Sequence, residues 1–208
     1  MGSTVSTSDL QALWAGLAKD DTGALKLLME NTYQVMFGYG MRFSKDRDFV
    51  EDCIQDVFVA IWQHRKKLVV PDSPKGYLLT SLRRKMINNG VKGTWISIDS
   101  LYDFDPAQEI SPEAALFAGE ETVYLAERMK TLLSKLSDRQ REAVYLRFYQ
   151  NLERPEIASV MNISEQSVSN LLQKALHTLR KSWPATHYSP LLNATLLSWL
   201  LKTTLLVS

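Results

Sequence analysis

The sequence predicts an all-α protein, built as two small helical domains joined by an acidic linker. Apolar residues recur every three or four positions in successive segments, and no segment before residue 93 shows the period-2 alternation of a strand. Charge divides the chain at the same places. Residues 1–92 hold 13 lysines and arginines against 10 acids, residues 93–122 hold seven acids and no base, and residues 123–183 hold 10 bases against six acids. We therefore expect a helical domain over 8–92, a linker over 93–122, a helix-turn-helix domain over 123–183 and an apolar tail over 184–208.

Composition excludes several classes of protein. The chain has 208 residues, of which 45% are hydrophobic, so it can form packed cores. The single cysteine, Cys53, excludes an internal disulfide, and a polar leader over 1–7 is not a signal peptide, so we expect a cytoplasmic protein. The sequence has no Gly-rich phosphate loop, no metal-ligand spacing and no nucleophile elbow. We therefore expect no enzyme activity, no catalytic residue, no metal and no cofactor.

The first domain reads as four helices. The first covers 9–18, and the second follows Asp20 or Thr22 as its cap and runs through Phe37. The third runs over 49–65 and has a buried stripe made by Val50, Ile54, Val57, Phe58, Ile61 and Trp62.

Three polar residues of this third helix, Asp52, Gln55 and Asp56, lie off the apolar stripe. Asp52 and Asp56 are one turn apart, and like charges at that spacing mildly destabilise an isolated helix. The acidic face is therefore either an ordinary solvated surface or a binding surface.

The segment 70–76 contains two prolines and a glycine, which predict a break between helices. A fourth helix then covers 77–89, with Leu78, Leu82 and Met86 recurring on one side. The rest of its surface is crowded with cations and amides, which suit a phosphate backbone and bases: Arg83, Arg84, Lys85, Asn88 and Asn89.

The acidic linker carries turn residues over 103–107 and 110–113. For most of its length, an ordinary solvated connection between two domains explains this segment equally well as a segment with a role of its own. Its first part contains apolar residues that predict packing against something: Trp95, Ile96, Ile98, Leu101, Tyr102 and Phe104.

Residues 137–181 predict a helix-turn-helix. A short helix over 156–161 precedes Asn162, a residue that tolerates the left-handed conformation of a turn. Ser164 caps a final helix whose apolar stripe comprises Val168, Leu171, Leu172, Ala175, Leu176 and Leu179. The opposite face begins with amides and hydroxyls suited to base edges and continues with cations suited to phosphates. The alternative is a helical hairpin with a solvated face.

These residues resemble a known family. Residues 51–62 together with 77–89 resemble region 2 of bacterial extracytoplasmic-function sigma factors, and residues 136–142 followed by 155–171 are similar to their region 4. The resemblance covers about 8–92 and 123–182, in the family's order. Region 4 alone is moderately specific, because response-regulator DNA-binding domains share its helix-turn-helix, whereas the two halves together are specific.

The resemblance implies an alternative sigma factor that binds core RNA polymerase and directs transcription initiation at promoters. Asp52, Gln55 and Asp56 match region 2.2 positions that grip the polymerase largest subunit, and 136–149 matches region 4.1, which meets the polymerase flap. The loop over 71–75 and the following helix match the regions that capture and melt the −10 element, through Lys75, Arg83, Arg84, Lys85 and Asn88. The last helix matches the one placed at the −35 element, through Ser164, Gln166, Ser167, Ser169, Asn170, Gln173 and Lys174.

The family pattern also implies an anti-sigma factor partner, often membrane-borne, that hides the polymerase-binding surfaces. Two domains on an acidic linker hold no fixed orientation unless something clamps them. We expect a compact free protein, packed through the apolar residues of 95–104 and the Leu-rich tail from Pro190, with its DNA-binding faces partly hidden. The tail reads as an amphipathic helix on the second domain or on a partner, with a membrane-spanning helix as the alternative.

Three features of the sequence depart from the family pattern. Asn162 stands where a turn glycine is usual, residues 153–155 replace the Ser or Thr cap, and Arg84, Lys85 and Asn88 alter the region 2.4 pattern that sets base preference. The competing interpretation is a two-domain helix-turn-helix regulator with a helical sensor domain. A sigma factor acts through core polymerase, whereas such a regulator binds duplex DNA alone.

Overall fold

The computed structural model describes residues 6–93, 95 and 131–182, and every regular element within these residues is a helix. The all-α prediction is therefore confirmed. Four helices form the first domain: α1 (Thr7–Leu17), α2 (Thr22–Gly40), α3 (Arg47–His64) and α4 (Pro74–Asn88). The second domain contains α8 (Asp138–Val144), the π-helix η2 (Tyr145–Tyr149), α9 (Arg154–Met161) and α10 (Glu165–Ser182).

Side-chain caps begin the helices of the first domain. Ser6 and Asp9 form a reciprocal capping box at the start of α1. The cap of α2 is Asp21 rather than Asp20 or Thr22, so that prediction was wrong by one residue. Asp21 has an extended backbone and accepts from the amides of Gly23 and Ala24, whereas Asp20 adopts a left-handed φ of 64°.

The fourth helix begins three residues earlier than the sequence predicts. Ser73 caps α4, and its hydroxyl accepts from the amide of Gly76 at 3.1 Å. Pro74 occupies the first helical position, where a missing N–H costs no hydrogen bond. Lys75 is therefore in the first turn of a helix, not in a loop.

The core of the first domain lies between α4 and the helices around it. α4 contacts α1, α2 and α3, and the buried face of α3 carries five of the six residues predicted for its stripe, with Cys53 added and Trp62 only half-buried. The side chains that are almost completely buried include Trp14, Leu28, Met36, Ile54, Leu79 and Leu82.

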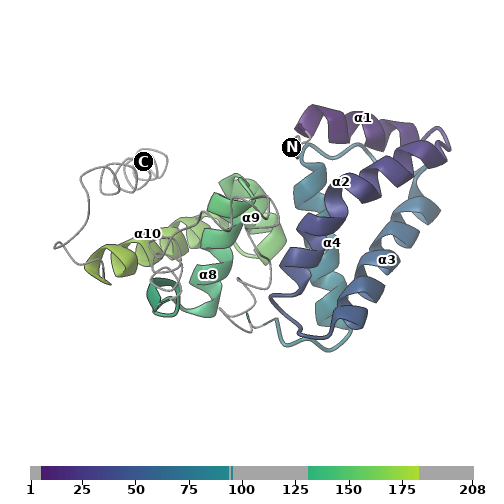
Figure 1. Ribbon diagram of the computed structural model, residues 1–208. Coiled ribbons are helices and arrows are strands. Elements are labelled where there is room, and N and C mark those ends of the chain that lie inside the picture. Colours follow the sequence, from purple (N-terminus) through teal and green to yellow (C-terminus); the bar gives the residue numbers. More distant parts are fainter. Residues whose placement is uncertain (1–5, 94, 96–130, 183–208) are drawn as a thin grey trace, which may run out of the picture.

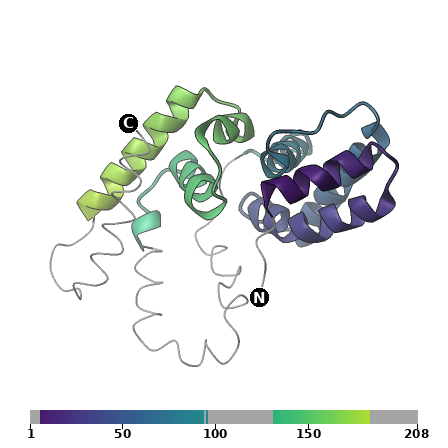
Figure 2. The same ribbon diagram turned by 90° about the horizontal axis from the view of Figure 1, so that it is seen from above.

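The two domains are in contact. Figure 1 shows α8, α9 and α10 beside the first domain, with α9 next to α4, and the perpendicular view of Figure 2 shows the same neighbours. Trp95 is buried at this junction, 3% exposed, against the rings of Tyr39, Phe43 and Tyr145. The predicted packing of the first part of the linker is confirmed for Trp95. The other linker residues named above and the tail from Pro190 lie outside the described residues.

The second domain contains one π-helix within its described residues. Helices of this type are rare and are often associated with functional sites. η2 places the rings of Tyr145 and Tyr149 in a stack, with centroids 5.1 Å apart, and Tyr145 faces the first domain. None of the helices described here is long and apolar enough to cross a bilayer.

Candidate nucleic-acid and polymerase interface

The turn between α9 and α10 has the geometry that the sequence predicts. Asn162 adopts the left-handed conformation, with φ 53° and ψ 55°, and the amide of Ile163 bonds the carbonyl of Ala158 at 3.0 Å. The hydroxyl of Ser164 accepts from the amide of Ser167 at 3.2 Å and so caps the first turn of α10. The turn and cap fix the direction of α10 relative to α9.

One face of α10 presents amides and a cation to solvent. Gln166, Asn170, Gln173 and Lys174 are exposed, as is Ser164 in the turn, and Ser167 is half-buried. The amide of Gln166 donates to the Asn170 side-chain oxygen at 3.2 Å, so these two groups are held together one turn apart. Amides arranged in this way suit bidentate contact with base edges in a major groove.

The prediction that Ser169 faces DNA was wrong. The residue is only 9% exposed and its hydroxyl donates to the carbonyl of Glu165 at 3.1 Å. Ser169 lies three residues before Leu172 and seven before Leu176, so helical spacing places it at the margin of the apolar stripe. The spacing in the sequence therefore already indicated that Ser169 lies at the buried margin of the helix.

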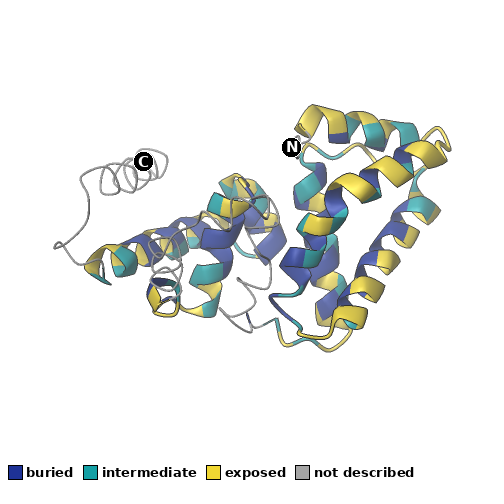
Figure 3. Ribbon diagram, viewed as in Figure 1, coloured by how far each residue is buried: buried dark blue, intermediate teal, exposed yellow. Residues whose placement is uncertain are grey.

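The predicted acidic face of α3 is open to solvent. Asp52, Gln55 and Asp56 are all exposed, and Figure 3 shows exposed residues along the outer side of this helix. The carboxylate of Asp56 lies 2.7 Å from the ammonium group of Lys85 on α4, and this hydrogen bond raises the pKa of Lys85. The two surfaces predicted to bind polymerase and −10 DNA therefore adjoin each other.

A shallow groove of about 340 Å³ runs between α3 and α4. It carries charges of both signs together with an aromatic ring and an amide, from Asp56, Tyr77, Arg84, Lys85 and Asn88. Arg84 and Asn88 are exposed, as predicted. The groove is lined by two cations, one acid and several apolar residues. Its exposed ring suits stacking with the bases of single-stranded nucleic acid, and Arg84 suits pairing with a phosphate.

Two of the five residues predicted for the −10 element are not on the open surface. Arg83 is 9% exposed, and its Nε donates to the carboxylate of Glu142 on α8 at 2.9 Å. Lys75 donates from Nζ to the carbonyl of Gln150 at 3.2 Å, and burial lowers its pKa. Arg83 is covered because Glu142 of the second domain pairs with it, and it lies at helical spacing from the buried Leu79 and Met86.

The sequence gave no role to several residues that build the domain junction. Glu142, 2% exposed, also accepts from the hydroxyl of Tyr39 at 2.8 Å. The guanidinium of Arg42, 2% exposed, lies 4.1 Å from the centroid of Tyr145, and burial lowers its pKa. The sequence did contain one sign that these charged residues are buried, because each lies beside apolar residues. Glu142 precedes an apolar run, and Arg42 lies between Met41 and Phe43.

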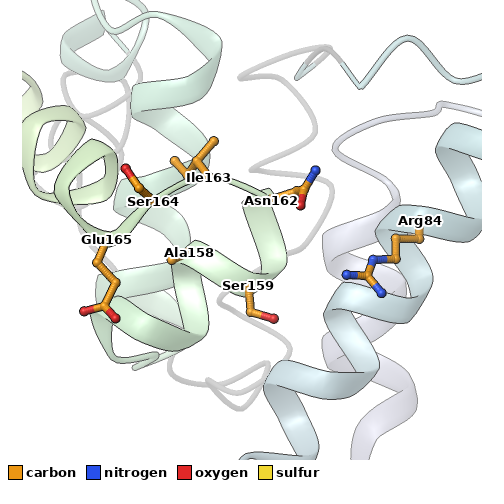
Figure 4. Close-up of a pocket in the computed structure, with 7 residues that line it drawn as sticks. All are labelled: Arg84, Ala158, Ser159, Asn162, Ile163, Ser164 and Glu165. Carbon is orange, nitrogen blue, oxygen red and sulfur yellow. The ribbon is translucent and has the colours of Figure 1, made fainter.

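Arg84 faces the helix-turn-helix across an open hollow of about 490 Å³. Figure 4 shows its guanidinium directed from α4 toward Ser159 and Asn162, with Ser164 and Glu165 on the far side. Lys75, Arg83 and Arg84 of α4 therefore lie against or opposite the second domain, whereas Lys85 pairs with Asp56 of α3.

Comparison with known proteins identifies both domains. Residues 28–96 match the family model described as Sigma-70 region 2, and residues 126–179 match Sigma-70, region 4. The chain is 25% identical over 182 residues to the ECF RNA polymerase sigma factor SigK of Mycobacterium tuberculosis (strain ATCC 25618 / H37Rv), covering 84% of this chain and 93% of that protein. SigK of Mycobacterium ulcerans (strain Agy99) is 23% identical over 185 residues, with 86% and 96% covered.

The fold also resembles a solved structure, that of CnrH in complex with the cytosolic domain of CnrY. The TM-score is 0.53 at 22% sequence identity, and the match covers 82% of this chain and 94% of that chain. At this identity the likeness concerns the fold.

Proposed function

Because this chain belongs to the extracytoplasmic-function sigma factors of RNA polymerase, we propose that it binds core polymerase and directs initiation at promoters with specific −10 and −35 elements. In this proposal the exposed acidic face of α3, with Asp52, Gln55 and Asp56, binds the polymerase. A sigma factor directs transcription, and the polymerase catalyses it.

The −35 element is assigned to α10. The observation that carries this assignment is the exposed row of Gln166, Asn170, Gln173 and Lys174 on a helix that follows a left-handed turn at Asn162. Helices of this kind enter the major groove with their first residues toward the bases. Ser164 and Ser167 lie at the start of α10 and suit phosphate contacts, whereas Ser169 is assigned a structural role because its hydroxyl is bonded within the helix.

The −10 element is assigned to the groove between α3 and α4. Arg84, Lys85 and Asn88 border it, whereas Lys75 and Arg83 lie on the side of α4 that faces the second domain and become accessible to DNA when that domain moves away. Single-stranded DNA suits this surface, because a ring and cations lie side by side along one groove.

Reconstitution with core polymerase tests the proposal. The protein should direct runoff transcription from a promoter fragment selected from random sequence, and altering either element of that fragment should abolish the product. Binding to duplex DNA without any effect on core polymerase would instead favour the helix-turn-helix regulator with a helical sensor. The match of the first domain to region 2 supports the sigma factor.

We also propose that an anti-sigma factor, part of a membrane-borne protein, binds this chain. The structural neighbour CnrH was solved in complex with the cytosolic domain of CnrY, and this supports the proposal that a partner comparable to CnrY binds the present chain. The partner should compete with core polymerase for α3. Its binding should therefore weaken in Asp52→Arg and stay unchanged in Glu30→Arg, which reverses an exposed charge on α2.

A further inference from the structure

Two hydrogen-bond donors of the first domain meet at one buried carboxylate of the second domain. Glu142 on α8 accepts from Tyr39 of α2 at 2.8 Å and from Arg83 of α4 at 2.9 Å. Exposure is 2% for Glu142 and 0% for Tyr39, so water does not substitute for either partner. The ion pair is therefore a contact between the domains, and it disappears if they separate.

The cation of this pair is one that the proposed function assigns to promoter DNA. Arg83 donates to Glu142 through the same guanidinium that a phosphate would need. Lys75, a second such cation, is bonded to the carbonyl of Gln150. Arg84 faces the helix-turn-helix across the hollow in Figure 4. The second domain thus covers Arg83 and part of Lys75, and it leaves Arg84 exposed.

Besides its aromatic contacts, the junction contains an ion pair that another anion can replace. A buried ion pair contributes little net stability, because the desolvation of both charges offsets their attraction, but it is sensitive to the loss of either partner. A phosphate that takes Arg83 leaves Glu142 free to return to water as the domains part. The exchange replaces one charge-assisted hydrogen bond by another.

We propose that Glu142 is a latch that closes this sigma factor: its carboxylate holds Arg83 in the place of a −10 phosphate, so that domain opening and −10 binding are coupled. This inference rests on the proposed −10 role of α4 and adds its regulation. Closure leaves the Gln166–Lys174 face of α10 and the acidic face of α3 exposed, so polymerase and −35 DNA can engage before the latch opens.

A disulfide across the junction gives the sharpest test. A Cβ placed on Gly76 of α4 would lie 3.6 Å from the Cβ of Glu156 on α9, within the range found in disulfides. The same Cβ would lie 2.9 Å from the hydroxyl of Ser73, which must turn aside. The reduced form of the Gly76→Cys/Glu156→Cys protein controls for that change, and the wild-type chain has only the buried Cys53.

We expect the oxidised, stapled protein to lose runoff transcription with core polymerase and binding to a single-stranded −10 oligonucleotide. Reductant should restore both to the level of the wild-type protein, which itself should not respond to the oxidant. Full transcription by protein shown to be cross-linked on a non-reducing gel would overturn the latch. Inactive wild-type protein with core polymerase would overturn the proposed function instead, so the two failures are distinct.

Glu142→Gln tests the carboxylate itself. The amide keeps the shape and an acceptor for Tyr39 but removes the charge that pairs with Arg83. Compared with the wild-type protein, we expect this variant to have a larger radius of gyration in small-angle scattering. We also expect it to bind the −10 oligonucleotide about fivefold more tightly, at the lower end of known allosteric couplings. Asp138→Asn is the matched control, because Asp138 is an acid of the same helix that pairs with Arg141 within it. Equal scattering and equal affinity in both variants would contradict the proposal.

Discussion

The ammonium group of Lys85 lies 2.7 Å from the carboxylate of Asp56, so a cation assigned to −10 DNA and an acid assigned to polymerase share one ion pair between α4 and α3. Asp52, one turn earlier on α3, is exposed and has no such role in the groove. Substitutions of the two acids are therefore expected to have the same effect on polymerase binding and different effects on DNA binding.

Charge reversal at either acid should abolish association with core polymerase. We expect this of both Asp52→Arg and Asp56→Arg, because each puts a cation on the acidic surface that is assigned to the polymerase. Both side chains are exposed, so helix content measured by circular dichroism should not change. Glu30→Arg on α2 is the control and should co-purify with core normally. Retention of core binding by both α3 variants would remove the polymerase role from this face.

Neutralising the acids should separate the two roles. Asp56→Ala releases Lys85 from its ion pair, so binding of a single-stranded −10 oligonucleotide, followed by fluorescence anisotropy, should become tighter while core binding weakens. Asp52→Ala should weaken core binding and leave oligonucleotide affinity unchanged. If Asp56→Ala lowered the affinity for DNA, Lys85 would need Asp56 for its position, and the ion pair would belong to the DNA site.

Arg84 should make a salt-dependent contact in the promoter complex. It is exposed beside the groove between α3 and α4, and the loss of one phosphate contact reduces the slope of log affinity against log salt by about 0.9. Arg84→Ala should show that reduction, whereas Lys45→Ala, on the turn before α3, should not. Equal slopes for Arg84→Ala and the wild-type protein would mean that this cation faces water. Arg83 is unsuitable for the same measurement, because its removal also leaves the buried Glu142 unpaired.

The elements were predictable to the extent that their own sequence determines them. The left-handed turn at Asn162 and the cap at Ser164 depend on local backbone chemistry and were found as expected. The stripes of α3 and α10 depend on local spacing and were found in most positions, with Trp62, Leu171 and Leu179 only half-buried. The position of Arg83 depends on Glu142, 59 residues away, and on a second domain covering α4. A cation on a helix is predicted to face solvent or DNA unless its distant partner is known. The closed junction could therefore not be predicted from the sequence.

Two further differences have local causes. Pro74 read as a break because a helix interior excludes proline, yet the first helical position accepts it and moves Lys75 into α4. Ser169 read as a DNA-facing hydroxyl because of its polarity, although its spacing from Leu172 and Leu176 placed it at the buried margin. In both cases position within the helix outweighed residue type.

Asn162 should have a measurable effect on stability. Its φ of 53° and ψ of 55° are in the left-handed region, where a residue with a Cβ and no amide to bond locally costs about 1–2 kcal/mol. Asn162→Ala should therefore lower the free energy of unfolding in urea by about 1 kcal/mol, and Asn162→Gly should leave it near the wild-type value. Equal destabilisation by both substitutions would indicate that the side-chain amide, rather than the backbone conformation, stabilises the turn.

The −35 surface should separate into residues that read bases and residues that hold the backbone. Gln166 and Asn170 are exposed and bonded to each other at the start of α10, so truncating either to Ala should cost about 1–3 kcal/mol at one or two base positions and little elsewhere. Lys174→Ala should weaken binding to all sequences alike, because an ammonium group bonds phosphates without regard to the base.

Ser169→Ala provides the internal control in that series. Its hydroxyl bonds Glu165 within the helix, so its loss should leave base preference unchanged. Binding of each variant to a set of −35 duplexes with single base changes, measured at one salt concentration, distinguishes these patterns. If Gln166→Ala and Asn170→Ala lost affinity uniformly across the set, as Lys174→Ala is expected to do, α10 would hold the backbone without reading the bases. A changed base preference in Ser169→Ala would show that this hydroxyl turns outward when DNA binds.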